Sequence, residues 1–288
     1  MNFKKGILIP VGGNEDKGIE DNDRHTLDFI GEGILHRVMM ESGGVDAKIV
    51  VIPAASIIPV EVGENYLSAF GTLGCKNVTV LDIRSREDAE SDRAIELIST
   101  ANCVMMSGGD QSKITEKIGG TEIHQILKHR FEHEENFVIA GTSAGAMAMA
   151  SEMIAGGSAK ESLFKGAVRM SEGLGLIEQL TIDTHFIQRG RFGRLAEAVA
   201  KFPQTIGIGL AEDTGLVIKN NTAEVIGSGM VIIFDGRKLK HNNETILKQG
   251  TPMSLTNLKT HILANGDRFN IKKKQVKVLP LESPFTYK

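Results

Sequence analysis

The sequence predicts an α/β fold in which helices cover both faces of a parallel sheet. From residue 6 onward, short apolar runs typical of strands alternate with longer helical patterns. Strand and crossover helix repeated in this order indicate βαβ units. Glycine-rich and polar segments follow several of the predicted strands. Because parallel sheets carry their sites at the carboxyl ends of the strands, these segments are the first place to look for function.

The predicted strands and helices alternate up to a serine at position 143. Strands are predicted at residues 6–10, 48–52, 78–82, 103–106 and 137–139. Helices are predicted at residues 27–41, 61–73 and 86–99, with further helical turns after residue 106. Strands at 180–185 and 206–213 then end on a histidine and on two acids. An antiparallel extension of the same sheet is predicted from short runs at 217–218, 223–226 and 231–234, and beyond residue 237 only 274–279 is β-like.

Length and composition fit one soluble domain. The chain has 288 residues, of which 41% are hydrophobic and 24% charged, and no linker, repeat or low-complexity block divides it. We therefore expect a single α/β domain over residues 1–288, with a parallel core at about 6–212 and a β-rich extension at about 213–288.

Charge and apolar content exclude several classes of partner. The net charge of −3 gives no basic footprint, and two tyrosines with no tryptophan offer few stacking platforms, so nucleic acid is not expected as a partner. No apolar run approaches the 18 residues of a membrane span, and the run before Pro10 is too short for a signal peptide. Cys75 and Cys103 suit buried thiols of a reducing, cytoplasmic setting. The histidines and cysteines do not have the sequence spacing of metal ligands, so neither a metal nor another cofactor is expected.

The candidate nucleophile lies in residues 137–150, which read as strand, sharp turn and helix. Gly141-Thr-Ser143-Ala-Gly145 fits the G-x-S-x-G pattern, in which flanking glycines let the serine hydroxyl project from the end of the sheet. The amide of Ala144, at the positive end of the following helix, is a candidate oxyanion donor. The alternative is a tight turn in which the serine only caps the helix.

Two further loops follow predicted strands. One is Gly12-Gly-Asn-Glu-Asp-Lys17, and the other is Ser107-Gly-Gly-Asp-Gln111. A Gly-Gly turn can expose backbone amides as an anion-binding nest, so Gly109 is a candidate second oxyanion donor. In the alternative interpretation the glycines serve only the turn conformation.

A serine nucleophile needs a histidine base to take its proton, and the histidine needs a carboxylate that fixes its tautomer and stabilises the imidazolium. Among the eight histidines, only His185 ends a predicted strand and precedes a glycine-containing loop. Glu212 and Asp213 end a later strand, and the residues alone leave both open as the acid, with Asp183 as a further competitor. The order serine, histidine, acid differs from that of the α/β-hydrolases, where the acid comes before a late histidine.

Five motifs together closely resemble the cyanophycinases, a family of serine peptidases that includes dipeptidase E. They are Gly-Gly-x-Glu-Asp-Lys near the start, Gly108-Gly-Asp-Gln111, Gly141-Thr-Ser-Ala-Gly-Ala146, Asp183-Thr-His-Phe-Ile-Gln-Arg-Gly-Arg-Phe-Gly-Arg-Leu195 and Gly209-Leu-Ala-Glu-Asp-Thr214. The resemblance covers about residues 6–235. It implies the three-layer α/β sandwich of the class I glutamine amidotransferases (flavodoxin-like), with a mainly parallel sheet and serine in place of the usual cysteine nucleophile.

The resemblance also implies an activity and a set of site residues. The expected activity is that of an exopeptidase that hydrolyses cyanophycin to β-aspartyl-arginine dipeptides. Cyanophycin is a poly-aspartate that carries arginine on every side-chain carboxyl. The resemblance also implies a homodimer. Ser143 matches the family nucleophile, His185 its base and Glu212 its third member. Positions associated with the substrate are matched by Gln111, Asp183, Arg189, Arg191 and Arg194. Thr184 departs from the glutamine that the family often has next to the histidine.

The arginines are expected to recognise substrate carboxylates, because a planar guanidinium binds a carboxylate through two parallel hydrogen bonds. For any one of them, the alternative is a solvated helix face or a structural ion pair. Two rival functions remain. One is a dipeptidase-E-like enzyme that cleaves short aspartyl peptides and needs fewer cationic groups. The other is a non-catalytic binding protein, which the intact serine, histidine and acid make the weaker interpretation.

Overall fold

The computed structural model describes residues 4–18 and 25–279, and its largest element is a nine-stranded sheet. The strand order is β17-β16-β11-β10-β1-β5-β4-β2-β3. Five neighbouring strands are parallel, namely β1 (Ile7–Val11), β5 (Val138–Thr142), β4 (Cys103–Met106), β2 (Lys48–Ile52) and β3 (Asn77–Val80). Their carboxyl ends therefore lie along one edge of the sheet.

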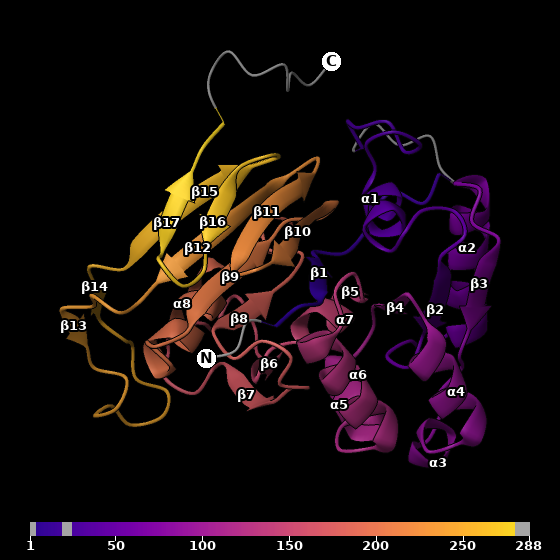
Figure 1. Cartoon of the computed structure of the whole chain (residues 1–288). Coiled ribbons are helices and arrows are strands. Elements are labelled where there is room, and N and C mark those ends of the chain that lie inside the picture. The colour runs from indigo at the N-terminus through magenta and orange to yellow at the C-terminus, as the bar shows by residue number, and fades with distance from the viewer. Residues whose placement is uncertain (1–3, 19–24, 280–288) are drawn as a thin grey trace.

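Helices cover both faces of these parallel strands (Figure 1). On one face lie α1 (Ile34–Glu41) and α2 (Pro59–Thr72), and on the other α3 (Arg86–Ala89), α4 (Asp92–Thr100), α5 (Gln111–Ile118) and α6 (Glu122–His133). Alternate residues of β1 divide between the two layers, with Ile7 and Ile9 packed against α1 and α2 and Leu8 packed on the opposite face. Burial on both sides explains why β1, β4 and β5 are almost wholly apolar.

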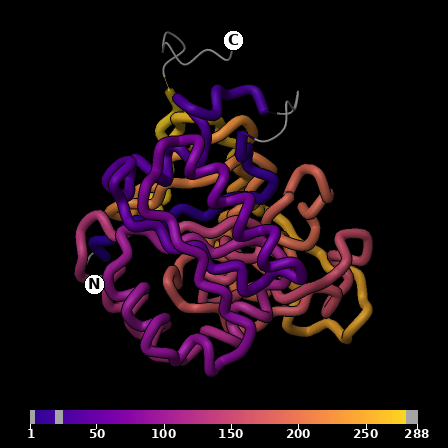
Figure 2. Tube along the Cα trace, turned by 90° about the vertical axis from the view of Figure 1, so that its right-hand side faces the viewer, coloured from indigo at the N-terminus to yellow at the C-terminus, as the bar shows by residue number. Residues whose placement is uncertain are grey.

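Antiparallel strands extend the sheet beyond β1. They are β10 (Thr214–Lys219), β11 (Thr222–Gly227), β16 (Arg268–Asn270) and β17 (Gln275–Lys277). In a view rotated by 90°, the helices of the parallel half, in violet to magenta, lie in front of these orange and yellow strands (Figure 2). The predicted fold class, an α/β sandwich with a parallel sheet and an antiparallel extension, is thereby confirmed.

Some strands predicted for this sheet belong to another one. A four-stranded sheet has the order β15-β12-β9-β8, with β8 (Leu180–Asp183), β9 (Ile206–Leu210), β12 (Met230–Asp235) and β15 (Lys259–Ala264). The prediction that residues 180–213 continue the parallel core, and that residues 231–234 extend it, was wrong on this point. The strands β8 and β9 are parallel to each other, but β9 pairs with β12 instead of with the large sheet. One face of this second sheet packs on the large sheet, and α8 (Phe192–Lys201) covers the other.

Two predicted helices differ from those observed. The helix expected at 27–41 begins only at Ile34, since Gly31 and Gly33 lie in the preceding turns and Gly33 is its N-cap. The helix expected at 86–99 is divided into α3 and α4 because the Ser91 hydroxyl accepts a hydrogen bond from the Ala94 amide and starts a new helix.

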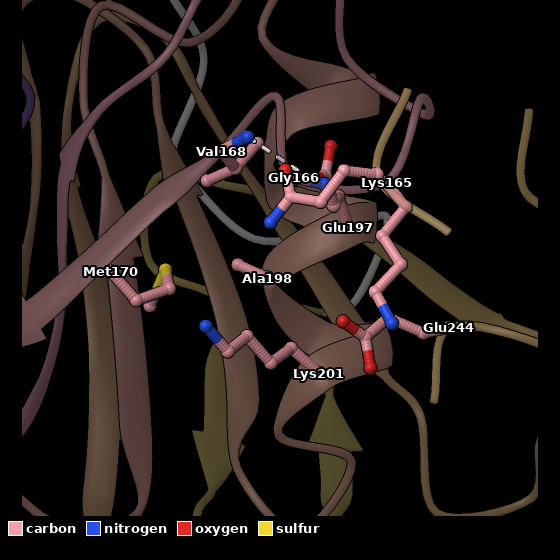
Figure 3. Close-up of a pocket in the computed structure, with 9 residues that line it drawn as sticks. Lys165, Gly166, Val168, Met170, Glu197, Ala198, Lys201 and Glu244 are labelled. Atoms are coloured by element: carbon pink, nitrogen blue, oxygen red, sulfur yellow. Dashed lines mark hydrogen bonds between the residues drawn. The ribbon is translucent and has the colours of Figure 1, made fainter. Parts of the chain in front are cut away.

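The remaining elements are short. They are α7 (Ala144–Met147), β6 (Glu152–Gly156), β7 (Arg169–Glu172), β13 (His241–Asn242) and β14 (Leu255–Thr256). Among them, α7 packs against β5, β1 and β8. The buried Glu197 carboxylate on α8 accepts hydrogen bonds from the amides of Leu163, Gly166 and Val168. A cavity of about 120 Å³ lies beside it, with Lys165 and Lys201 on its rim (Figure 3). Glu197 thus fastens the loop of residues 157–168 to α8.

Within residues 4–18 and 25–279, no helix has both the length and the apolar content that crossing a membrane requires.

Candidate active site

Ser143 lies on a strained turn between β5 and α7. Its backbone has φ 51° and ψ −107°, outside the regions that ordinary residues prefer. The flanking glycines are required by close packing: a Cβ atom on Gly141 would lie 2.6 Å from the Gly145 carbonyl carbon, and one on Gly145 would lie 2.3 Å from the Met106 oxygen. The turn has the geometry that the G-x-S-x-G pattern predicted.

A continuous hydrogen-bond chain joins this serine to a histidine and an acid. Ser143 Oγ is 2.9 Å from His185 Nε2, and His185 Nδ1 is 2.7 Å from Glu212 Oε1. The histidine follows the end of β8, and the acid follows the end of β9. With Nδ1–H donating to the carboxylate, a neutral imidazole keeps its Nε2 lone pair for the serine proton.

Asp213 turns away from the histidine. Its buried carboxylate accepts hydrogen bonds from the Ser228 hydroxyl, at 2.5 Å, and from the Asp16 amide, at 3.1 Å. Burial raises the pKa of Asp213 above its ordinary value, against the effect of these hydrogen bonds. Of the three acids that the residues alone left open, Glu212, the one that the family resemblance selected, is hydrogen-bonded to the imidazole in the structure, whereas Asp213 and Asp183 have other partners.

The turn after β1 holds all three segments in place. The amides of Ser143, His185 and Asp213 donate to the carbonyls of Val11, Gly12 and Gly13 at 2.9, 2.8 and 2.9 Å, respectively. Glycine is needed at both positions of the turn. A Cβ atom on Gly12 would lie 1.8 Å from the Ala211 oxygen, and one on Gly13 would lie 2.4 Å from His185 Cε1. Sequence reasoning noted this Gly-Gly loop but assigned it no role.

Glu15, in the same loop, is buried behind Ser143. Its carboxylate accepts hydrogen bonds of 2.5 Å from both Thr142 Oγ1 and Tyr66 Oη, and Lys17 Nζ is 3.0 Å away. Burial by itself would raise the pKa of Glu15, but the charge of Lys17 and the two hydroxyl donors outweigh it and hold that pKa below its usual range. An ionised carboxylate thus ties the residue before Ser143 to the first loop and to α2. The sequence carried no signal for this role beyond the acid in the loop.

The second glycine loop lies against Ser143. A Cβ atom on Gly108 would come within 3.3 Å of Ser143 Cβ, and Gly109 has φ +138° with no room for a side chain against the Ala55 oxygen. Among the described residues, none accepts a hydrogen bond from the amide of Gly109 or of Ala144. Both donors are therefore available to a developing negative charge.

The environment of His185 favours its neutral form. Its pKa lies below the usual value because burial disfavours the imidazolium by more than the hydrogen bond to Glu212 favours it. The positive charges of Arg189 and Arg191 lower the pKa further. At neutral pH the imidazole is therefore ready to accept a proton.

Asp183 and Arg194 form a buried ion pair. Asp183 is 0% exposed and Arg194 5% exposed, and the guanidinium binds both carboxylate oxygens, one of them at 2.8 Å. Arg194 also reaches the Gly157 carbonyl at 3.3 Å. This burial does not fit the expectation that Asp183 and Arg194 contact substrate, and it fits the alternative of a structural ion pair.

Arg189, Arg191 and Gln111 remain closer to solvent. Arg191 is half-buried, and its guanidinium donates to Asp183 at 3.2 Å and to the Thr184 carbonyl at 2.8 Å. Burial lowers the pKa of Arg191 to about 10, which still leaves it charged at neutral pH. Arg189 is exposed, and the Gln111 side-chain amide donates to the Ile154 carbonyl at 2.8 Å.

Thr184 does not face the reacting groups. Its side chain is fully buried, and its hydroxyl donates to Met147 Sδ at 3.3 Å. The departure from glutamine at this position therefore changes the packing between β8 and α7.

Comparisons with known proteins identify one matching family and several similar proteins. The model of the family described as peptidase family S51 matches residues 32–226. A cyanophycinase from Geminocystis herdmanii is 37% identical over 274 residues, which cover 95% of this chain and 96% of that protein. A cyanophycinase from Trichormus variabilis is 36% identical over 273 residues, which cover 94% of this chain and 88% of that protein.

A solved structure shares the fold. The crystal structure of a peptidase from an acI-B1 actinobacterium superposes with a TM-score of 0.66 at 22% identity, covering 92% of this chain and 96% of that one.

The lowered pKa of His185 predicts an acidic limb in kcat/KM with a midpoint below pH 6.5 and a plateau at neutral pH, since the base acts in its neutral form. Arg189→Gln removes a charge that lowers this pKa, so the midpoint should move to higher pH. Profiles of kcat/KM against pH measure the shift, with Arg93→Gln, an exposed arginine on α4, as the control. A midpoint that stays in place or falls in the Arg189 variant would contradict the electrostatic coupling.

Glu15→Gln should lower both kcat and stability. The amide carries no charge to pair with Lys17, and its NH2 group cannot accept a hydrogen bond from Thr142 or Tyr66. We expect the free energy of unfolding to fall by about 1.5–3 kcal/mol, the range for a hydrogen bond to a charged group. Denaturant unfolding and steady-state kinetics measure the two effects, with Glu61→Gln on the exposed side of α2 as the control. A variant that matched this control in both measurements would remove Glu15 from the site.

Arg194→Met should destabilise the fold, because it leaves the buried Asp183 carboxylate with the Thr184 amide and with Arg191, at 3.2 Å, as its one remaining cationic partner among the described residues. Breaking a buried ion pair from one side costs about 3–5 kcal/mol. Arg189→Met, at an exposed position, should change the free energy of unfolding by no more than about 0.5 kcal/mol. Urea denaturation of both variants measures the difference. Equally small effects would argue that Arg194 is free to bind substrate.

Proposed function

Because the chain belongs to peptidase family S51, and so is a serine peptidase, we propose that it hydrolyses cyanophycin as an exopeptidase and releases β-aspartyl-arginine dipeptides. The single observation that carries the proposal is the hydrogen-bond chain from Ser143 through His185 to Glu212. The choice of cyanophycin as the substrate comes from the relatives named cyanophycinase, which align over nearly the whole chain.

The proposed reaction begins with attack by Ser143 Oγ on the carbonyl carbon of an aspartyl peptide bond. His185 Nε2 takes the serine proton, and Glu212 stabilises the imidazolium through Nδ1–H. The amides of Gly109 and Ala144 donate to the oxyanion of the tetrahedral intermediate. When the intermediate collapses, the C–N bond breaks and the imidazolium gives its proton to the leaving amine. Water, activated by the same base, then attacks the acyl-enzyme, releases the acid product and restores the serine hydroxyl.

Two of the three arginines are candidates for substrate recognition. Each arginyl branch of cyanophycin carries a free α-carboxylate, which a guanidinium binds through charge-assisted hydrogen bonds. Arg189 is exposed and close enough to His185 to affect its pKa, and the half-buried Arg191 is oriented by Asp183. Arg194 acts indirectly in this proposal, by holding Asp183 in place.

A second candidate function is cleavage of short aspartyl peptides, as in dipeptidase E. The observation that favours it is the burial of Arg194, which leaves fewer cationic groups for a highly charged polymer. The reaction steps would be the same, and only the recognition of arginyl branches would differ.

Incubation of the purified protein with cyanophycin tests the proposal. The wild-type protein should release β-aspartyl-arginine, and Ser143→Ala should reduce kcat by a factor on the order of 10⁴ or more, because no other group can attack. Ser171→Ala, at an exposed serine of β7, is the control. Chromatography and mass spectrometry of the products measure both results.

Two outcomes would change the assignment. Near-normal turnover by the Ser143 variant would exclude this serine as the nucleophile. Hydrolysis of short aspartyl peptides without hydrolysis of cyanophycin would favour the second candidate function.

A further inference from the structure

A cavity of about 340 Å³ lies at the carboxyl edge of the parallel sheet, beyond the glycine loop that borders Ser143. Its lining comes from three connections that follow neighbouring strands: the residues after β2, the residues after β3, and the helix α5 that follows β4. The lining residues on which the argument depends are Ile57, Asp82, Arg84, Lys113 and Lys117. None of them belongs to the hydrogen-bonded set Ser143, His185 and Glu212 described above.

The strand order sets the distance from the nucleophile. The parallel strands run β5, β4, β2, β3, so the lining residues that follow β2 and β3 lie two and three strands away from Ser143, and α5, which follows β4, brings its lysines beside them. Neighbouring strands are about 4.8 Å apart, which puts the cavity roughly 10–14 Å along the edge. Only a few residues separate the two places, because Gly108 borders Ser143 and the next residue, Gly109, packs against the backbone of Ala55 and of Ser56, which lines the cavity.

Positive charge exceeds negative charge in the lining. Arg84 is paired with Asp82, at 2.8 Å. Lys117 Nζ donates to the carbonyls of Ala54 and Ile83, at 2.8 and 3.4 Å, which orient the ammonium group without neutralising it. Lys113 lies one turn earlier on the same face of α5 and is half-buried. Within the described part of the chain, neither lysine forms an ion pair with a carboxylate, so the cavity suits an anionic group.

We propose that this cavity is a distal subsite that binds α-carboxylates of the arginyl branches on cyanophycin, three or four aspartyl units from the bond that is cleaved. The inference rests on the proposed function. An extended backbone advances about 3.3–3.6 Å per residue, so three or four units span the 10–14 Å from Ser143. The side chain of Ile57, which is 85% exposed, offers an apolar surface to the methylene stem of an arginyl branch. The guanidinium of that branch faces away from the two lysines, because like charges repel.

The subsite allows an exopeptidase to stay bound to the polymer that remains after each cleavage. Each cleavage removes one unit and leaves the next unit to move into the site. A contact several units away keeps the chain close while this happens, and raises its effective concentration at Ser143. Short substrates cannot use this contact, so KM should fall as the substrate lengthens.

Kinetics with substrates of two lengths test the proposal. Wild-type enzyme is assayed on cyanophycin and on a two-unit β-aspartyl-arginine oligomer, which is too short to reach the cavity. Lys113→Glu reverses one charge of the lining, and glutamate is well tolerated in the first turn of a helix. Lys117 is left intact because it also holds two backbone carbonyls. We expect Lys113→Glu to raise the ratio of KM for cyanophycin to KM for the oligomer about tenfold.

A matched control is Lys76→Glu, at the opposite end of β3, where the lysine is exposed and lies outside the proposed site. It should leave the ratio of the two KM values unchanged. Added salt should weaken the preference of the wild-type enzyme for the longer substrate, because exposed charges are screened.

The outcomes separate the two proposals. If the oligomer is hydrolysed but the KM ratio is the same in wild type, Lys113→Glu and Lys76→Glu, the subsite is excluded and the proposed function stands. If neither cyanophycin nor the oligomer is hydrolysed, the proposed function fails and the subsite falls with it. An equal rise in KM for both substrates would also overturn the subsite, because it would place the effect of Lys113 at the reacting centre.

Discussion

The structure depends on one short turn, residues 11–13, which accepts a backbone hydrogen bond from each segment of the candidate active site. The serine, histidine and acid segments come from three strands in two different sheets, and this turn is where they meet. The contact leaves no space for side chains at Gly12 or Gly13. A change in the first turn would therefore move all three segments of the candidate site at once.

This convergence also accounts for the strained backbone. Ser143, His185 and Asp213 have φ values of 51°, 47° and 45°, in a region that costs a non-glycine residue about 1–3 kcal/mol. Each of the three donates its amide to the turn, so the strain is opposed by a hydrogen bond at the same residue. The result is a serine hydroxyl and an imidazole nitrogen held 2.9 Å apart before any substrate arrives. Preorganisation of this kind is what lowers the cost of reaching the transition state.

Buried charges support the same arrangement from both sides. Behind the serine, the Glu15 carboxylate of the first loop accepts hydrogen bonds from Thr142 and from Tyr66 on α2. Beside the histidine, Asp183 joins the end of β8 to Arg194 on α8, and Glu197 secures the neighbouring loop. Carboxylates in such places are stable only with their partners, since an unpaired buried charge is costly. They make the surroundings of the site rigid without touching the reacting atoms.

The sequence by itself determined the alternation of strands and helices up to Ser143, the elbow around that serine, and the choice of His185, because each depends on a local pattern of apolar, glycine and polar residues. Its residues alone left Glu212, Asp213 and Asp183 open as the acid, and only the family resemblance selected Glu212. The pattern also placed β8, β9 and β12 in the wrong sheet, left a structural ion pair only as an alternative for Arg194, and gave no sign that Glu15 lies buried behind Ser143. Only the tertiary structure decided these points. All three kinds of property depend on which distant segments come together: the sheet to which a strand belongs, the direction of a side chain beyond a strand end, and the burial of a charge. Contacts between residues more than a hundred positions apart, such as Glu15 with Thr142, leave no local pattern in the sequence.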